Sequence, residues 1–138
     1  MASLSEFAKR IRRRADSIVE EVDKTVVETA IAIDQIVVVE TPVLNGFARG
    51  NWDVGINTPI TDFDEGKADK DGNSTINRNN GKILTRQNGQ TIYLSNPTPY
   101  IGRLNDGWSA QAPKGFVQQA VKTGAEYVAR RRVVKDRI

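Results

Sequence analysis

Mostly apolar residues recur every three or four positions along the first part of the chain. The series is Leu4, Phe7, Ile11, Ala15, Ile18, Val22, Val26, Thr29, Ile33 and Val37. This spacing is the stripe of an amphipathic helix, and no glycine or proline interrupts it. Ser3 and Glu6 match a capping box at its start, and Thr41-Pro42 ends it because a residue before proline avoids the helical region. We therefore predict one long helix within residues 1–40.

The second half of this segment has a different character from the first. Residues 26–39 are apolar on more than one face and rich in β-branched side chains, which suits burial on two sides. A break near Thr25 and a strand at residues 36–39 are the alternatives. An unbroken helix over residues 5–39 would be about 50 Å long, which is longer than a domain of 138 residues needs. One end of the helix should then project or pack against a partner.

The middle of the chain predicts a small antiparallel sheet. Trp52, Val54 and Ile56 alternate with polar or small residues, as in a half-buried strand. Residues 82–85 and 91–95 flank an Asn-Gly pair, which is typical of a tight hairpin turn. Together these segments indicate a sheet of three or four strands.

The remaining segments predict a loop and a last helix. Residues 58–81 are dense in glycine, asparagine and aspartate, so we expect a long, flexible, extended loop. Pro113 suits the first turn of a short C-terminal helix, with Phe116 and Ala120 on one face. The fold class is therefore α+β, with residues 1–138 forming a single domain in which the long N-terminal helix packs on the sheet.

The composition excludes most common catalytic groups. The chain has no cysteine and no histidine, so disulfides, thiolate nucleophiles, the usual zinc sites and imidazole general bases are absent. No run approaches the roughly 20 apolar residues that span a bilayer. We expect no membrane partner.

One spacing does suggest chemistry. Asp53 is followed, after eleven intervening residues, by Glu65-Gly66-Lys67. Metal-dependent nucleases share this Asp and Glu-x-Lys spacing, in which two carboxylates hold Mg²⁺ and the lysine steers the attacking water. Those enzymes carry the Glu and Lys on a rigid strand, whereas here both fall in the predicted loop. We therefore expect no catalytic residues, no bound metal, no cofactor and no enzymatic activity.

Positive charge is concentrated at the two ends of the chain. The clusters are Arg12, Arg13 and Arg14 near the start and Arg130, Arg131 and Arg132 near the end. Because the whole chain carries only +3, the middle must be acidic. Basic ends of this kind contact a nucleic-acid backbone without sequence preference, an acidic surface of a neighbouring copy, or only solvent.

Two segments resemble the signature regions of the small tail-completion and head-tail joining (neck) proteins of long-tailed bacteriophages. They are ETPVLNGFARGNWDVGI and IYLSNPTPYIGRLNDGWSAQAPKGFVQQAV. In that family a long helix ends at a Thr-Pro-Val step, a glycine turn with a basic residue enters a strand, and a Pro-Tyr segment precedes an Ala-Pro step into the last helix. The matching positions are Thr41, Pro42, Val43, Gly46, Arg49, Trp52, Pro99, Tyr100, Leu104, Asp106, Gly107, Ala112, Pro113 and Phe116. The chain departs from the pattern at Asn105-Asp106, where a glutamate before the glycine is expected.

The resemblance implies a virion structural protein without catalysis, assembled in the host cytoplasm. It would form a homo-oligomeric ring, with six copies expected, in the tail or neck of the particle. Its partners would be itself and other neck, connector or tail-tube proteins, with non-specific contact to DNA in the lumen. Trp108 would serve either as a core residue or as an interface anchor. The alternative function is a nucleic-acid-binding accessory protein that uses its basic ends.

Overall fold

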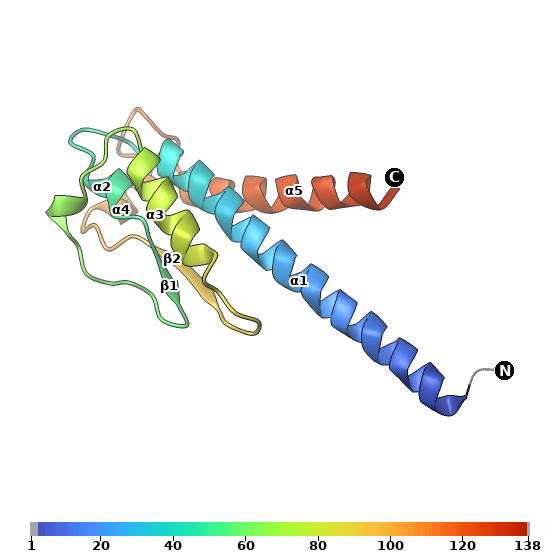
Figure 1. Cartoon of the computed structure of the whole chain (residues 1–138). Coiled ribbons are helices and arrows are strands. Elements are labelled where there is room, and N and C mark those ends of the chain that lie inside the picture. Colours follow the sequence, from blue (N-terminus) through green and yellow to red (C-terminus); the bar gives the residue numbers. More distant parts are fainter. Residues whose placement is uncertain (1–2, 138) are drawn as a thin grey trace.

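The computed structural model describes residues 3–137, and it describes side chains as far as Arg131. The elements along the chain are α1 (Leu4–Glu40), α2 (Phe47–Gly50), β1 (Asp53–Ile56), the 3-10 turn η1 (Glu65–Lys67), α3 (Asn73–Ile83), β2 (Ile92–Ser95), α4 (Ile101–Asn105) and α5 (Phe116–Arg137). The shorter elements form a head at one end of the molecule, and α1 and α5 extend away from it (Figure 1). The fold is α+β, as predicted.

The long helix α1 is unbroken over 37 residues. The predicted capping box is present, since the Glu6 amide donates to Ser3 Oγ (3.1 Å) and the Ser3 amide donates to Glu6 Oε2 (3.2 Å). Thr41 ends the helix in an extended conformation. The alternatives of a break near Thr25 and a strand at residues 36–39 are wrong.

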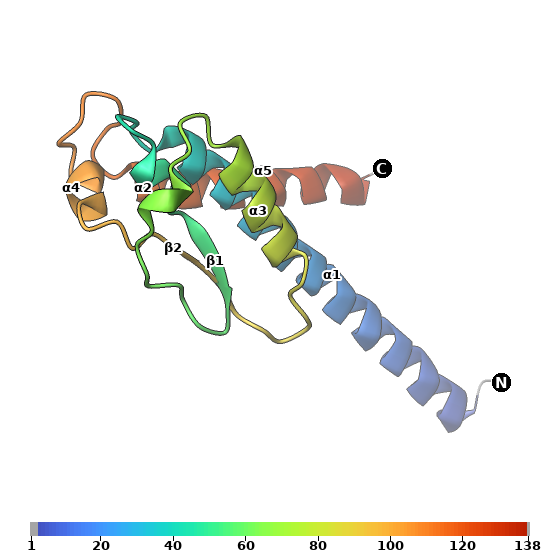
Figure 2. The same cartoon turned by 60° about the vertical axis from the view of Figure 1, so that its left-hand side comes forward.

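The two halves of α1 have opposite environments. Every residue from 3 to 22 is exposed, and this half extends from the head as a free-standing arm in both views (Figures 1 and 2). The second half carries the buried residues Ala30, Asp34, Val37 and Val38. The length of the helix thus exceeds what the head covers, as its sequence predicted.

The sheet is smaller than predicted. Strands β1 and β2 pair antiparallel, with Val54 opposite Leu94, and they are the two strands of the described part of the chain. The predicted total of three or four is wrong because residues 82–85 do not form a strand. Lys82 and Ile83 close α3 instead, and the chain turns from there into β2.

The predicted extended loop over residues 58–81 is wrong from Asn73 onward, where α3 begins, and residues 58–72 hold only the short η1. Asp69 caps this helix from a distance, accepting hydrogen bonds from the amides of Gly72 (3.1 Å) and Thr75 (2.9 Å). Buried Thr75, Asn79 and Ile83 recur at steps of four, so one face of α3 packs into the head. Tertiary packing, rather than local propensity, holds this polar helix in place.

Two apolar clusters make up the core. The first joins α1, Trp52 and the start of α5; its buried members are Val37, Val38, Trp52, Ala112, Phe116 and Ala120. The second lies under the sheet and consists of Ala30, Val54 and Ile83, with Ile92 and Leu94 packed against them. The C-terminal half of α1 therefore connects both clusters.

Helix α5 differs from its prediction at its start and in its length. It begins at Phe116 and runs for 22 residues, so it is not short. Pro113 lies before the helix, not in its first turn, because Gly115 adopts a left-handed φ of +78° between them. Farther along, a Cβ at Gly124 would lie 2.7 Å from Ile33 Cγ1. A glycine is thus what allows α5 to cross α1 so closely.

Candidate assembly surfaces

Arg49 closes the C-terminal end of α1. Its guanidinium donates to the carbonyl oxygens of Val39 (2.8 Å) and Thr41 (2.9 Å), which lie at and just past the last turn of the helix. A third hydrogen bond goes to the carbonyl of Lys70 (2.7 Å). A cation at this position also complements the negative end of the helix dipole. The basic residue of the first signature region therefore ties the exit of α1 to the segment that precedes α3.

Trp52 links the end of α1 to the apolar core. Its indole Nε1 donates to Thr41 Oγ1 (2.7 Å), and that hydroxyl donates in turn to the carbonyl of Val37 (2.6 Å). Thr41 is fully buried, and Trp52 is buried in the same cluster as Phe116. The structure thus brings Thr41, Trp52 and Phe116 together, although Phe116 comes from the second signature region.

The turn at Gly46 is fixed by close packing. Gly46 has a φ of +86°, and a Cβ there would lie 2.8 Å from the backbone of Asp69. The Asp69 amide donates to the Gly46 carbonyl (3.0 Å), and Pro42 is buried nearby in sequence. These two motif residues shape the backbone where the chain leaves α1.

A reciprocal pair of hydrogen bonds joins the two signature regions. The Val43 amide donates to Gln111 Oε1 (2.8 Å), and Gln111 Nε2 donates to the Val43 carbonyl (2.9 Å). Between the regions lies a shallow cavity of about 300 Å³, lined in part by Pro42, Tyr100 and Leu104. Gln111 was not predicted as a functional residue, because its partner lies 68 residues away along the chain.

The rest of the second signature region lies on the outside of the head. Pro99, Gly107 and Pro113 are exposed, and Tyr100 is half-buried.

Trp108 is 73% exposed, so the alternative that placed it in the core is wrong. Leu44, from the first signature region, is 90% exposed. The Arg103 guanidinium lies 5.3 Å from the centre of the Trp108 ring. We call Leu44, Arg103 and Trp108 the head patch; α4, which carries Arg103, lies on the side of the head away from both termini (Figures 1 and 2).

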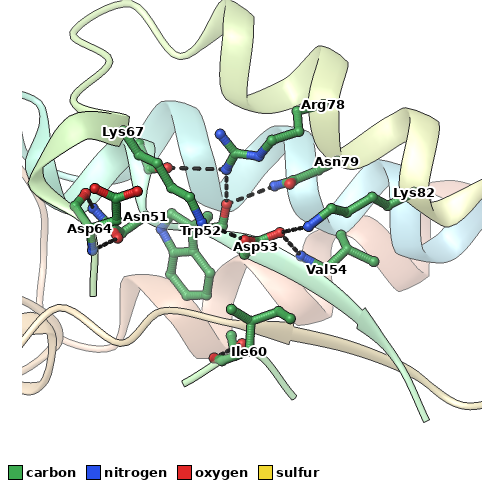
Figure 3. Close-up of polar contacts among 12 residues, drawn as sticks. Asn51, Trp52, Asp53, Val54, Ile60, Asp64, Lys67, Arg78, Asn79 and Lys82 are labelled. Carbon is green, nitrogen blue, oxygen red and sulfur yellow. Dashed lines mark hydrogen bonds and ion pairs between the residues drawn. The ribbon is translucent and has the colours of Figure 1, made fainter. Parts of the chain in front are cut away.

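Asp53 and Lys67, two members of the nuclease-like spacing, do lie together, as Figure 3 shows. Lys67 Nζ is 2.8 Å from Asp53 Oδ2, and Lys82 Nζ is 2.5 Å from Oδ1. Burial alone would raise the pKa of Asp53, but hydrogen bonds from the two lysines outweigh it and lower the pKa to about 2. Glu65 is exposed on η1. Among residues 3–137 no cluster of three potential metal ligands is found, and both oxygens of Asp53 are occupied by ammonium groups.

A second polar cluster lies deeper, between α1 and α3. Asn79 Nδ2 donates to Asp34 Oδ1 (2.9 Å) and to the Trp52 carbonyl (3.0 Å). Arg78 donates to the same carbonyl (2.8 Å) and to that of Gly50 (3.1 Å) (Figure 3). Asp34 is fully buried, and its Oδ2 has no hydrogen-bond partner among the residues that the structure describes. Burial raises the pKa of Asp34 to about 6, although the bond from Asn79 opposes the change.

The basic residues lie on the two helices that extend away from the head. We call the exposed half of α1 and the C-terminal part of α5 the two arms. Arg12, Arg13 and Arg14 are exposed on α1, and Arg130 and Arg131 are exposed on α5. The side chain of Arg132 lies outside the described part. Both arms point to the same side of the molecule (Figures 1 and 2). The structure therefore places the two charge clusters on one side and the head patch on the other.

None of the described helices is both long and apolar enough to cross a membrane. Comparison with known proteins adds no relative: the chain matches no family model, no curated protein and no solved structure.

Proposed function

We propose that this chain is a virion structural protein, a ring-forming tail-completion or head-tail connector subunit of a long-tailed bacteriophage. It acts without catalysis and without a cofactor, and it is incorporated into the tail or neck after assembly in the host cytoplasm. Its partners are further copies of itself, with six in the ring, and other neck, connector or tail-tube proteins. DNA passing through the lumen is a non-specific contact.

The observation that carries this proposal is the surface left uncovered at both ends of the subunit. At one end, apolar side chains of α1 such as Leu4, Phe7 and Ile11 are exposed. At the other end, the head patch exposes Leu44 and Trp108. Exposed apolar side chains that follow one face of a helix are typical of a protein interface. A head-to-tail ring requires two different surfaces on each subunit, and this chain has them.

The signature regions support the same function through their structural role. Thr41, Arg49, Trp52 and Phe116 fix the direction in which α1 leaves the head, through the contacts described above. A subunit that contacts neighbours through long arms depends on this direction. Mixing the purified chain with tails that lack this component, then measuring incorporation by electron microscopy, tests the proposal. A chain that never joins a tail and never forms an assembly contradicts it.

We expect no hydrolysis of DNA by this protein with Mg²⁺ or Mn²⁺. Asp53 is held by Lys67 and Lys82, and Glu65 lies outside that group, so two carboxylates do not converge on one metal position. A nicking assay on supercoiled plasmid measures this, with a Glu65→Ala variant as the control. Metal-dependent cleavage by the original chain that disappears in Glu65→Ala would contradict a non-catalytic function.

Charge reversal of Arg130, Arg131 and Arg132 to glutamate should weaken assembly, and the loss should be largest at low salt. The two arginines whose side chains are described are exposed, so the fold should remain intact. Sedimentation at low and high salt gives the fraction of assembled protein. A matched control reverses the exposed Lys70, Lys114 and Lys122. Equal assembly by the arginine variant and the original chain at both salt concentrations would contradict an electrostatic contact between neighbours.

The second candidate is a nucleic-acid-binding accessory protein, which the common direction of the two basic arms favours. Arg12, Arg13 and Arg14 are exposed on α1, and Arg130 and Arg131 are exposed on α5. The free ends of these two helices extend to the same side of the head (Figures 1 and 2). Binding of this kind loses affinity steeply as salt increases. A monomer or dimer that binds DNA with such a salt dependence, and does not join tails, would favour this function over the first.

A further inference from the structure

We propose that two copies of this chain pair through the exposed half of α1, antiparallel, with the two-fold axis at Ala15. The surface that pairs is the α1 stripe, which we define as Leu4, Phe7, Ile11, Ala15, Ile18 and Val22. In the pair, the α1 stripe of one copy therefore packs against the α1 stripe of the other.

The stripe is available for this contact along its whole length. All six residues are exposed, and the larger ones expose about half of their surface or more, from 52% at Phe7 to 85% at Leu4. Their spacing of three and four residues places them on one face of a continuous helix. The described part of the chain contributes nothing else that covers them.

The stripe leads directly into an apolar groove on the head. This groove has a volume of about 610 Å³, and α1 lines it with Val26, Ala30 and Ile33, while β2 contributes Ile92 and Leu94. In an antiparallel pair centred on Ala15, Leu4 of one copy lies beside Val26 of the other, because both are eleven residues from the axis. Each arm tip then enters the groove of the other copy.

The distribution of charge selects the antiparallel direction. Residues 9–14 carry five cations and no anion, whereas residues 16–23 carry four carboxylates and no cation. An antiparallel pair centred on Ala15 sets each basic block opposite the acidic block of the other copy. A parallel pair in register would set the blocks opposite their own kind, which is repulsive. The small side chain of Ala15 at the axis also lets the two helices approach closely.

This pair and the head-to-tail contact of the proposed ring draw on the same exposed residues of α1, so the stripe serves one contact at a time. A two-fold contact uses the same surface on both copies and closes at two. The inference therefore concerns the free chain, and it rests on the exposure, the groove and the charge of α1 and not on the ring.

Cross-linking tests the geometry, and the natural chain has no cysteine to interfere. With a short bis-maleimide, Ala15→Cys should cross-link to itself, and Phe7→Cys should cross-link to Val22→Cys when the two variants are mixed. Phe7→Cys alone should not cross-link, because its two copies would lie about 24 Å apart along the axis. Ser17→Cys is the control, since its side chain is turned by about 100° from Ile18. Efficient self-linking of Phe7→Cys, or none by Ala15→Cys, would overturn the proposal.

Sedimentation of matched variants tests the contact itself. The original chain should contain pairs at about 100 µM, and Ile11→Glu should shift its dissociation constant upward at least about tenfold. Ser17→Glu makes the same change of charge on the same helix and should leave the pair intact. A chain that stays monomeric, or one whose arm binds anionic vesicles as a monomer, contradicts the pairing. Pairs that never join tails would instead contradict the proposed function and leave the pairing standing.

Discussion

Replacing Asp34 with asparagine should increase the free energy of unfolding by up to about 3 kcal/mol near pH 8. The reason is that burial holds the pKa of Asp34 at about 6, above its ordinary value of 3.8. The folded state therefore binds a proton more tightly than the unfolded state, and stability falls as the pH rises from about 4 to about 6. An asparagine carries no charge to desolvate, and it still offers an oxygen to Asn79.

The pH dependence separates this explanation from simple repacking. Near pH 4 the carboxyl of Asp34 is protonated in the folded state, so Asp34→Asn should change stability little there. Urea unfolding at both pH values gives the two differences. Equal stabilisation at pH 4 and pH 8 would mean that charge burial is not the cause. The experiment does not go below about pH 4 because Asp53, whose pKa is lowered to about 2, loses its own contribution to stability as the pH falls further.

Phe116→Ala should reduce the free energy of unfolding by about 3–5 kcal/mol. Phe116 is fully buried and packs with Val37, Val38 and Trp52, where α5 begins against the end of α1. Truncation leaves a cavity at the place where both signature regions meet. Tyr127→Ala is the control on the same helix, because Tyr127 is 54% exposed. Chemical denaturation measures both, and similar losses for the two variants would contradict the central position of Phe116.

The parts of the fold that local pattern specifies were predictable from the sequence. The spacing of apolar residues, the Ser3–Glu6 capping box and the Thr41-Pro42 step together predicted α1 almost to the residue. The alternation around Val54 predicted β1. In each case the signal lies within a few positions along the chain, so one sequence contains it.

The parts that depend on distant partners were not predictable. Helix α3 has a sequence rich in asparagine, and it is held by the Asp69 cap and by burial of Asn79 against α1. Because α3 extends to Ile83, residues 82–85 do not form the predicted strand. The hydrogen bonds between Gln111 and Val43 and the orphan oxygen of Asp34 likewise depend on three-dimensional contacts. The difference between buried Trp52 and exposed Trp108 also required the structure.

Because α1 and α5 cross closely at Gly124, a small change of the crossing angle there moves the distant ends of both helices. Past this point each helix continues toward its basic tip, while the Ile33 contact at Gly124 limits how the two can move. From Ile33 to Leu4 the helix spans about 44 Å, so a rotation of about 10° at the crossing would displace its tip by about 8 Å. A one-atom change of volume at Gly124 therefore acts far from where it is made. Substitutions at this glycine should therefore alter the distance between the free ends of α1 and α5 in one subunit.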